Sequence, residues 1–569
     1  MRLRGGGVSA PFLDEASAHS SDRYWLLKTI CLNNLYGVDL MGEAAEIAKL
    51  RLFLKLAAQL DDAMLMEPLP DLDFNIKSGN LLVGIADPDD AQQRFGASLL
   101  SAPGLATAEE AAQQAAEAYD AFAAAQLAET ADGAFHSSTD SGKAQLMAQI
   151  DAARNLADGA LYDLRDELVG FEQWRESHQP FHWFAEFPSV WRDRGHGRGF
   201  DVIIGNPPYV KPSAVDEYTW QGYKTQTCPD LYAVCTERAS TLLNDQGRFA
   251  MIVMHSICFH KGFKVLRDCL TGIFPSLWVS SYSRIPDGLF SGSARVRNSI
   301  IIAARFGSSG LSTSRCRRWL TEGRGSLFGT QQYVRANAEL LRCGDTPQWL
   351  FLDDRGVAGA LAGMVEGCQP LEEVLDRGGT HAVGYKTVAQ YSLGIYTQEP
   401  PTVNLSTGMP AATVSERSKW LYFGEQVHRD LAFIVLSGRW AYLWWLAYGD
   451  EFHVTRGVLA ALPCDIERLA STAASGGLPS DPPCDMELVT LVKDLLACSE
   501  VLQDEMPKHL KWKANAGVNV GRFDLRVPEC RAITDEADWL LAQAWGLTRE
   551  QYEAAGNLRD RMTFGHKGD

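Results

Sequence analysis

Short apolar runs alternate with longer helical patterns over the first ninety residues. The run Leu35–Asp39 ends in a carboxylate and is followed by apolar positions at helical spacing from Glu43 to Leu60. A second apolar run at 74–76 leads into the turn Gly79–Leu82. Alternation of strand and helix at this spacing predicts a doubly wound α/β sheet.

The pattern changes between 91 and 175, where alanine dominates and β-branched residues are almost missing. Helical patterns cover Glu109–Leu127 and Lys143–Leu168. The segment 91–170 holds twelve Asp and Glu against four Lys and Arg. We interpret this segment as a helical insertion between two strands of the sheet, with a solvated surface and no chemistry of its own.

Strand patterns return at 201–205, 249–253 and 298–303, with a helical pattern at 231–243 between the first two. The apolar run 201–205 predicts a buried strand. The sequence then becomes rich in Arg and Gly, next in aromatic residues, and finally helical. The predicted organisation is the first part of a core at 1–90, a helical insertion at 91–175, the second part of the core at 176–310, a linker at 311–345, a mixed α/β domain at 346–480 and a helical region at 481–569.

Composition and charge narrow the class of protein. The chain has 569 residues, of which 46% are hydrophobic and 22% charged, so we expect several globular domains. No apolar run is long enough for a membrane helix, and no secretory signal is visible, so we expect no membrane partner and a cytoplasmic, nucleoid-associated location. The twelve cysteines form no Cys-x-x-Cys pair, which favours free thiols over a zinc site.

The net charge of −18 is unevenly distributed. Residues 200–345 hold seventeen Lys and Arg against eleven Asp and Glu. Because DNA binding needs a local positive surface and not a basic whole chain, this excess permits a DNA-binding face in the middle of the chain.

The motif Asn206-Pro207-Pro208-Tyr209 follows the apolar run 201–205 directly. Ligands of α/β proteins bind at the carboxyl ends of such strands. The two prolines fix φ and leave rigid carbonyl acceptors, the asparagine adds a side-chain acceptor, and the tyrosine adds a face for stacking. The motif therefore predicts a cradle for a planar group that carries an amine; the alternative is an ordinary proline-rich turn.

This motif resembles the catalytic motif of amino-group methyltransferases that use S-adenosylmethionine. Together with further segments, the chain resembles the large adenine-specific (N6) DNA methylases of type IIG restriction-modification and BREX-type systems, over about residues 21–470. Those segments are Leu35–Asp39 with its helix, Asn75–Leu82, Phe181–Pro188, Asp230–Tyr232 and Phe452–Thr455. The resemblance implies a Rossmann-like methyltransferase core, a target-recognition domain at 346–480 and a helical C-terminal region.

The resemblance also implies a cofactor site for S-adenosylmethionine. Asp39 would bind the ribose hydroxyls, Asn80 would contact the cofactor adenine, and Leu81 would pack on that ring. Asn80 stands where the family often has Asp. Without the resemblance, Asp39 is explained as a carboxylate at a helix start and Asn80 as a turn-forming residue.

The same resemblance assigns the target base. Asn206 and the carbonyl of Pro207 would accept hydrogen bonds from the N6 amine of adenine, and Tyr209 would stack on the base after it has flipped out of the duplex. Pro208 completes the catalytic motif. Phe290 is a candidate second stacking face; its alternative is an ordinary loop aromatic.

One part of the family pattern is not found. The family begins its core with a strand and a Gly-rich turn that approaches the cofactor. Ahead of residue 21 only Gly5–Gly7 offers such a turn, and Met1–Arg4 is too short for a strand. We expect this chain to lack the cofactor loop, so that it is a gene fragment or receives the loop from a partner. The sequence contains no convincing Pro-Asp…Glu-x-Lys constellation of a nuclease, so we do not predict DNA cleavage by this chain.

Three weaker features remain open. His255, Cys258 and His260 lie close in sequence, but the ligand set is incomplete, so we expect no metal. The aromatic residues between 440 and 448 predict either a stacking platform or a domain core. The arginines between 315 and 324 would touch phosphate or belong to a solvated linker.

The sequence therefore predicts a site-specific DNA adenine methyltransferase of a restriction-modification or phage-defence system. Double-stranded DNA is the expected partner, with an upstream-encoded fragment or restriction and defence subunits as further ones. One alternative is a DNA-binding or specificity subunit with impaired catalysis. Another is a methyltransferase for a protein glutamine or for RNA, which the long region after 346 disfavours.

Overall fold

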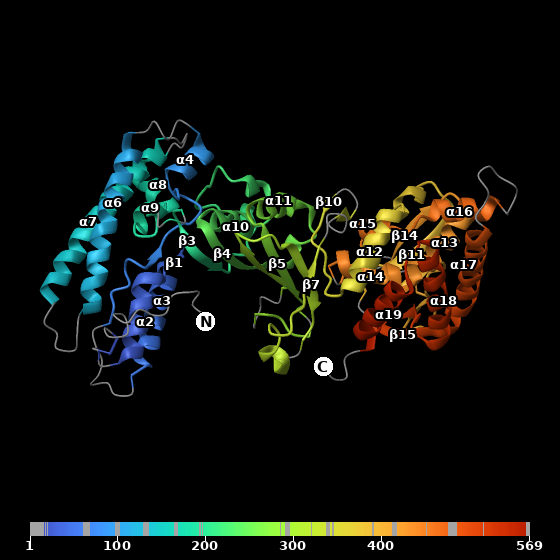
Figure 1. Cartoon of the computed structure of the whole chain (residues 1–569). Helices are drawn as coiled ribbons and strands as arrows, with labels where there is room; N and C mark the ends of the chain where they lie inside the picture. The colour runs from blue at the N-terminus through green and yellow to red at the C-terminus, as the bar shows by residue number, and fades with distance from the viewer. Residues whose placement is uncertain are drawn as a thin grey trace. The chain divides into compact units, whose positions relative to one another are not determined.

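The computed structural model describes residues 16–17, 19, 21–60, 69–96, 103–128, 136–163, 169–192, 195, 197–284, 286–290, 296–319, 321–336, 342–343, 346–389, 392–411, 418–450, 452–475, 486–515 and 517–564. The chain divides into two compact units (Figure 1). The first comprises Met1–Phe249 with Ala304–Phe306, and the second comprises Ala250–Ala303 with Gly307–Asp569.

The first unit begins with a parallel strand–helix–strand arrangement. β1 pairs with β2 in parallel, from Gly37 opposite Ile76 to Asp39 opposite Ser78. α3 connects the two strands, as the helical pattern after Asp39 predicts. The elements are α2 (Asp22–Asn34), β1 (Gly37–Asp39), α3 (Gly42–Ala57) and β2 (Ile76–Ser78).

Helices occupy the region that was predicted as an insertion. The two long predicted helices are confirmed as α6 and α7, which pack together through small buried alanines such as Ala112 and Ala153. Alanine lets two helix backbones approach closely, which explains the composition of this segment. The predicted end at Leu168 lies outside the described residues. The helices are α4 (Pro88–Phe95), α6 (Pro103–Ala128), α7 (His136–Tyr162), α8 (Phe171–His178) and α9 (Trp183–Glu186).

The main sheet has six strands in the order β3-β4-β6-β5-β7-β8. It is mixed, because β7 runs parallel to β5 and antiparallel to β8. The predicted α/β class is confirmed at this level. The elements are β3 (Phe200–Gly205), α10 (Tyr232–Thr241), β4 (Leu243–Met254), α11 (Lys264–Ile273), β5 (Ser276–Tyr282), β6 (Asn298–Ala304), β7 (Gly310–Arg317) and β8 (Val334–Arg335).

The structure differs from the sequence prediction at three places. The run 201–205, expected to be a buried strand, forms β3 at the end of its sheet, where Val202 and Ile204 are exposed. Gly310–Arg317, which the sequence assigns to a linker, forms β7 next to β5. Three of its five buried positions are polar (Ser312, Thr313 and Ser314), so the strand carries only a weak apolar signal. The C-terminal region, expected to be helical, also contains the antiparallel pair β15 (Leu510–Asn515) and β16 (Val518–Phe523).

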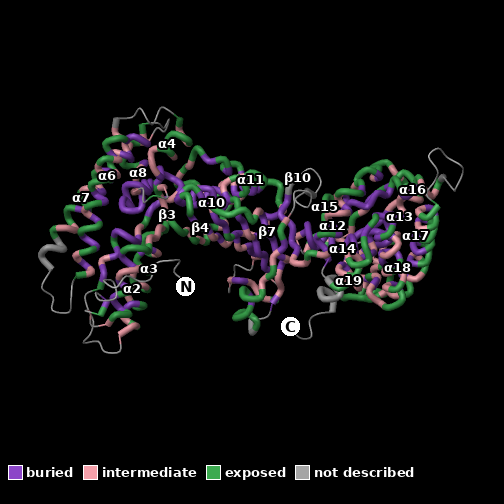
Figure 2. The backbone as a smooth tube through the Cα atoms, in the orientation of Figure 1, coloured by how far each residue is buried: buried purple, intermediate pink, exposed green. Residues whose placement is uncertain are grey.

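The rest of the second unit has a large apolar core. α13 and α14 lie within it, and every residue of α14 is buried (Figure 2). Within the described ranges, no helix combines the length and apolarity that crossing a membrane requires. The remaining elements are β9 (Arg342–Cys343), β10 (Thr346–Pro347), α12 (Arg355–Gly367), β11 (His381–Lys386), β12 (Ile395–Tyr396), β13 (Thr402–Asn404), β14 (Ser418–Phe423), α13 (Gln426–Ser437), α14 (Arg439–Tyr448), α15 (Arg456–Ala460), α16 (Ile466–Ser475), α17 (Met486–Glu505), α18 (Pro528–Ala544) and α19 (Arg549–Phe564).

Candidate functional site

The Asn206–Tyr209 motif forms an exposed turn directly after β3. The Tyr209 hydroxyl donates a hydrogen bond to Oδ1 of Asn206 over 3.1 Å. The rings of Pro207 and Pro208 fix the φ angles of these two residues, so the backbone between Asn206 and Tyr209 is constrained. The side-chain carbonyl of Asn206 is thereby oriented while the residue stays accessible to a ligand.

A second segment holds this turn from behind. The backbone N–H of Leu231 donates to the carbonyl of Val210 over 2.8 Å. The buried ring of Tyr232 meets the ring of Tyr209 edge-on, with 6.2 Å between centroids. Burial raises the pKa of Asp230, although the backbone N–H groups of Tyr232 and Val210 favour its charged form. The structure thus brings Asp230–Tyr232, singled out from the sequence, to the Asn206–Tyr209 motif.

Asp39 is exposed at the carboxyl end of β1. Its Oδ1 accepts the backbone N–H of Met41 over 2.9 Å, which fixes the entry into α3. Its backbone carbonyl accepts the N–H of Gly79 over 2.9 Å and so connects β1 to the end of β2. The carboxylate has a structural role at the start of the helix and remains accessible to a further donor.

Asn80 and Leu81 form the turn after β2. Asn80 is buried, and its Oδ1 accepts the backbone N–H of Leu82 over 3.1 Å. Leu81 is half-buried and packs against two hydrophobic clusters. The carbonyl that a cofactor adenine would contact is therefore already used in the chain's own turn, as the turn-forming interpretation expects.

A buried ionic network holds the same turn, and sequence reasoning did not find it. Arg238 of α10 donates to Asp90 over 2.9 Å and to the Tyr223 hydroxyl over 2.8 Å. Tyr223 donates in turn to the carbonyl of Leu82 over 2.9 Å. Burial alone would raise the pKa of Asp90, but the charges of Arg238 and Arg94 outweigh it and hold that pKa below its usual value.

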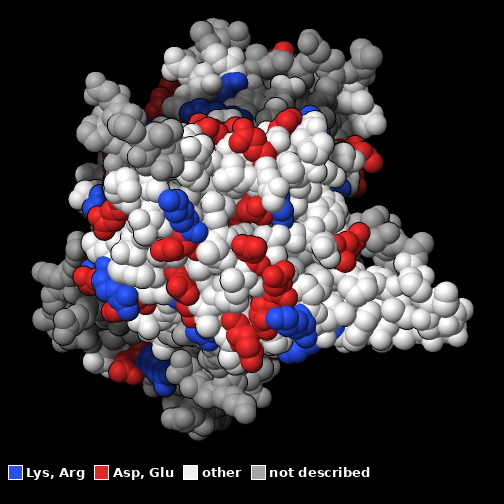
Figure 3. Space-filling view, turned by 90° about the vertical axis from the view of Figure 1, so that its right-hand side faces the viewer, with Lys and Arg blue, Asp and Glu red and all other residues white. Residues whose placement is uncertain are grey.

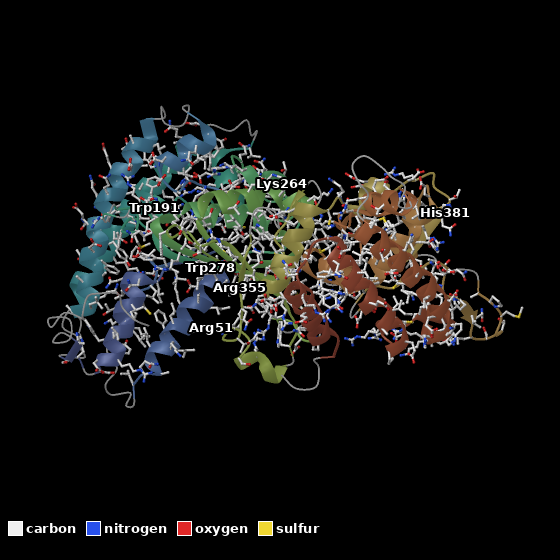
Figure 4. The ribbon with its side chains drawn as sticks, turned by 45° about the vertical axis from the view of Figure 1, so that its right-hand side comes forward. Arg51, Trp191, Lys264, Trp278, Arg355 and His381 are labelled. Carbon is white, nitrogen blue, oxygen red and sulfur yellow. The ribbon has the colours of Figure 1, made fainter. Side chains whose placement is uncertain are left out.

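The aromatic segment 181–187 packs beneath this turn. Gly84 has a φ of +90°, and a Cβ there would lie 2.4 Å from the carbonyl oxygen of Phe181, so only glycine fits. Trp183 donates its backbone N–H to the carbonyl of Ile85 over 3.0 Å. Trp191, labelled in Figure 4, meets Phe200 at the start of β3 edge-on at 5.5 Å between centroids. Within the segment, the ring of Phe187 lies 6.2 Å from that of Phe200, so the segment supports both the turn and β3.

Lys77 and Glu186 form a second buried pair next to this segment. Lys77 Nζ lies 2.7 Å from Oε2 of Glu186. Burial would raise the pKa of Glu186, but the charges of Lys77 and Arg154 lower it below the usual value. The pair thus connects β2 to α9.

The candidate residues of the first unit follow the carboxyl ends of three strands. Asp39 ends β1, Asn80 follows β2 and Asn206 follows β3. The rings of Tyr36 and Phe200, at the starts of β1 and β3, lie 5.9 Å apart, and Val38 and Ile203 join one hydrophobic cluster. The start of β1 therefore lies against the start of β3, and the two strands contribute to one hydrophobic cluster.

Phe290 lies in the second unit. It is half-buried against a small cluster formed by Tyr282, Leu289, Trp319 and Leu327. This environment matches that of an ordinary loop aromatic, and the role of Phe290 as a stacking face stays a prediction.

The weaker candidates have structural surroundings of their own. His255 is buried against Phe351, and the aromatic residues between 440 and 448 all belong to the core of the second unit. Arg315 pairs with Asp353 over 2.9 Å, and Arg324 donates to the carbonyl of Leu289 over 2.9 Å. The described residues hold no cluster of His, Cys, Asp and Glu suited to a metal ion.

One face of the molecule shows no concentration of basic side chains that would indicate DNA binding. On the face drawn in Figure 3, acidic and basic side chains are interspersed. A surface that binds phosphate through charge needs an excess of Lys and Arg. This face therefore lacks the single-sign field typical of a nucleic-acid interface.

Comparison with known proteins gives one family model and one curated relative. Residues 33–278 match the model described as Eco57I restriction-modification methylase. A protein of Methanocaldococcus jannaschii, described as a type II restriction enzyme and methyltransferase, is 28% identical over 312 residues, which is 48% of this chain and 26% of that protein. The chain thus spans about a quarter of the length of this relative.

Solved structures show only distant likeness. The type IIL restriction-modification enzyme MmeI in complex with DNA aligns at 12% identity and a TM-score of 0.36, covering 98% of this chain and 78% of that one. The DrdV–DNA complex aligns at 10% identity and a TM-score of 0.27, covering 72% and 62%. Scores this low carry no argument about the fold. The family match is the informative finding: residues 33–278 have the sequence signature of a restriction-modification methylase.

Proposed function

We propose that this chain is the methyltransferase part of a restriction-modification or phage-defence system and methylates N6 of adenine in DNA. The observation that carries the proposal is the exposed Asn206–Tyr209 turn, which follows β3 and is constrained by its internal hydrogen bond. This turn lies within the segment that matches a restriction-modification methylase.

The residues at the carboxyl ends of β1 and β2 fit S-adenosylmethionine in their chemistry. Asp39 offers an exposed carboxylate for ribose hydroxyls, and Leu81 offers an apolar side chain for the adenine ring. The Oδ1 of Asn80 already accepts a hydrogen bond from the backbone N–H of Leu82. Only its second lone pair would be available to accept a hydrogen bond from the cofactor adenine. When bound, the cofactor supplies an electrophilic methyl group on a sulfonium.

The Asn206–Tyr209 motif would bind the amine that receives this methyl group. Oδ1 of Asn206 and the carbonyl of Pro207 would each accept one N–H of the adenine N6 amine. These two hydrogen bonds direct the nitrogen lone pair out of the base plane, and Tyr209 would stack on the base. Because N6 is not accessible inside a duplex, the base would be flipped out first. Positioning then accounts for most of the catalysis.

DNA is the proposed partner, with restriction or defence subunits as further ones. The excess of Lys and Arg over Asp and Glu between 200 and 345 supports an electrostatic contact with phosphate. Sequence recognition would come from the predicted target-recognition domain at 346–480, and the protein would act at the nucleoid. Base contacts in the grooves, not charge, would set the sequence that is methylated.

A catalytically impaired DNA-binding subunit is the second candidate. One observation favours it: β1 and β3, whose carboxyl ends carry Asp39 and Asn206, belong to separate sheets. A methyltransferase site that spans two unconnected strands is less rigidly fixed than one on a continuous sheet. Retained DNA binding without methyl transfer would identify this alternative.

The proposal is tested by methyl transfer with product identification. The chain is incubated with S-adenosylmethionine labelled in the methyl group and with genomic DNA. Digested nucleosides are analysed by mass spectrometry. We expect N6-methyladenine, lost in Asn206→Ala and retained in Asn404→Ala, whose asparagine also orders its own turn through Ser406. Label in cytosine, RNA or protein, or in no product, would contradict the proposal.

A further inference from the structure

The hairpin of β15 and β16 carries basic side chains on one face (β15 is labelled in Figure 1). Lys511 lies directly opposite Arg522 in the register of the two strands, and Lys513 lies two positions further along β15. Residues that lie directly opposite each other, or two positions apart in one strand, point to the same side of a sheet. The three cations therefore share one face, and all three are exposed.

A fourth cation reaches this hairpin from β11. The Nζ of Lys386 donates to the backbone carbonyl of Gly521 over 3.4 Å, directly before Arg522 in the sequence. Burial and the positive charge of Arg522 both lower the pKa of Lys386. Among the groups that shift this pKa in the described part of the chain, none is a carboxylate. We call Lys386, Lys511, Lys513 and Arg522 the hairpin cluster.

Acidic side chains do not balance the hairpin cluster. Asp524, a buried carboxylate at the end of β16, pairs with Lys511 over 2.6 Å, and it also pairs with Arg526 over 3.1 Å. Within the ranges that the structure describes, the other three cations of the cluster have no ion pair with a carboxylate. The cluster is therefore a local excess of positive charge in a chain whose net charge is −18.

This arrangement is unfavourable for the folded chain alone. Like charges directly opposite each other on neighbouring strands, as in Lys511 and Arg522, lower the stability of a sheet. The partial burial of Lys386 adds a desolvation cost, because its ammonium group loses water without gaining a carboxylate. An anion bound at the hairpin cluster would offset both costs.

The geometry fits a polyanion better than a single ion. β13 extends the same face, because Thr402 lies opposite Val520, and Val520 lies opposite Lys513. Side chains two positions apart in a strand begin about 7 Å apart, so the basic groups are spread along the sheet. The phosphates of a nucleic acid backbone also form a row, and Lys, Arg and Thr side chains are common contacts to them.

We propose that the hairpin cluster binds the phosphate backbone of double-stranded DNA without reading its sequence. The proposal rests on the proposed function, which makes duplex DNA the substrate. It places three of the four cations at 511–522, outside the predicted recognition domain at 346–480. Contacts of Lys and Arg to phosphate add affinity through counterion release and contribute equally on every sequence. The cluster therefore holds the duplex, while other groups select the base.

The test measures binding of the intact chain to a fluorescent DNA duplex by anisotropy, at several salt concentrations and without S-adenosylmethionine. Lys513→Gln and Arg522→Gln should each lower the slope of the logarithm of the binding constant against the logarithm of salt concentration by about one. Each should also weaken binding about eightfold at about 0.1 M salt. The double variant should lower the slope by about two.

The matched control is Lys493→Gln, which removes the same charge from an exposed position of α17 in the same unit. It should leave the slope and the affinity unchanged. Lys513→Arg keeps the charge and should retain the slope. Because all these positions are exposed, every variant should unfold at the temperature of the parent chain, which thermal unfolding checks.

Four outcomes would each overturn the proposal. The first two are no binding of the duplex by the intact chain and a slope that the double variant leaves unchanged. The third is an equal effect of Lys493→Gln, which would trace the change to net charge. The fourth is a variant that alters the preferred DNA sequence, which would mean that the cluster reads bases.

Competition with other polyanions tests the choice of partner. Single-stranded RNA and vesicles of anionic phospholipid are offered to the same variants. Tighter binding of either one than of the duplex, lost in the double variant, would assign the hairpin cluster to that polyanion and overturn the proposal.

The readout does not depend on methyl transfer. A lowered slope in the variants without any methylated product would retain this inference and contradict the proposed function. Methylated DNA, with a slope that the variants leave unchanged, would do the reverse.

Discussion

β3 and α14 are both apolar in sequence, but they differ in how far the structure buries their side chains. Every residue of α14 is buried by helices and strands of the same unit. In β3, Val202 and Ile204 remain largely exposed at the edge of a sheet. An apolar pattern therefore predicts that a segment needs cover, but it does not say which molecule supplies the cover. In α14 the chain supplies it, whereas the described residues leave Val202 and Ile204 of β3 largely exposed.

The largest effect is expected on the free energy of unfolding, from a substitution in the buried helix α14. Trp444 of α14 is 1% exposed, packs on Tyr448 and donates its Nε1–H to the carbonyl of Val458 over 2.9 Å. Trp444→Ala should lower the free energy of unfolding by about 3–5 kcal/mol, because it leaves a cavity and an unpaired carbonyl. Denaturant unfolding of the intact chain, monitored for the second unit, measures this. Trp444→Phe keeps most of the ring and should cost clearly less; equal losses would contradict the packing argument.

The next largest effect is expected on methyl transfer, at the turn that follows the exposed strand β3. Asn206→Ala removes one of the two proposed acceptors of the target amine, so methyl transfer should fall about 100-fold, as on loss of a single positioned hydrogen-bonding group. Because Asn206 is exposed, unfolding should change by less than about 0.5 kcal/mol. Methylation kinetics of the intact chain measure the first value. A parallel fall in stability and activity would instead indicate a structural role.

The two units should also respond differently to acid. Burial, with the nearby charge of Arg297, lowers the pKa of His255 to about 3. The unfolded chain binds a proton at this residue near pH 6.5, and the folded chain does not, so stability in the second unit is lost as pH falls below that value. Between pH 7 and pH 5 this group should cost about 2 kcal/mol.

His255→Gln keeps a polar side chain for Ser299 and removes the titration, so the loss between pH 7 and pH 5 should largely disappear. In the first unit the pKa values of Asp90 and Glu186 are lowered, so their stabilisation persists at pH 5 and is lost only as pH falls through and below about 4. Unfolding at both pH values, followed separately for each unit, tests the contrast. An unchanged pH dependence in the variant would contradict it.

The smallest effect is expected where the chain leaves β3 uncovered. Ile204→Lys should change the free energy of unfolding of the chain alone by less than about 0.5 kcal/mol, because its side chain makes few contacts to lose. It should also reduce self-association at high concentration, since a lysine protects an open edge. Light scattering and denaturant unfolding measure both. A loss of more than about 2 kcal/mol would show that Ile204 is buried in solution.

The local parts of the candidate site could be predicted from the sequence. The run before Asn206 predicted β3, and the helical pattern after Asp39 predicted α3. Residues 230–232 could be connected with the motif only through the family resemblance, and the structure places them against Tyr209. These elements are predictable because a strand or a helix leaves its period in neighbouring residues.

The parts that depend on long-range contacts could not be predicted. Asp90, Tyr223 and Arg238 meet in one buried network although they lie far apart in sequence, and no periodicity marks such a meeting. β7 was missed because three of its five buried positions are serine or threonine, which are also common in loops. The exposure of Val202 and Ile204 was missed for a different reason. The sequence indicates that β3 is an apolar strand, but it does not indicate which elements lie next to that strand.

The most direct test of the account is calorimetric titration of the intact chain with S-adenosylmethionine. The account predicts binding that is weakened in Asp39→Ala, because this exposed carboxylate is the proposed acceptor of the ribose hydroxyls. No binding, or binding that Asp39→Ala leaves unchanged, would contradict the claim that Asp39 and the Asn206–Tyr209 motif belong to a methyltransferase site.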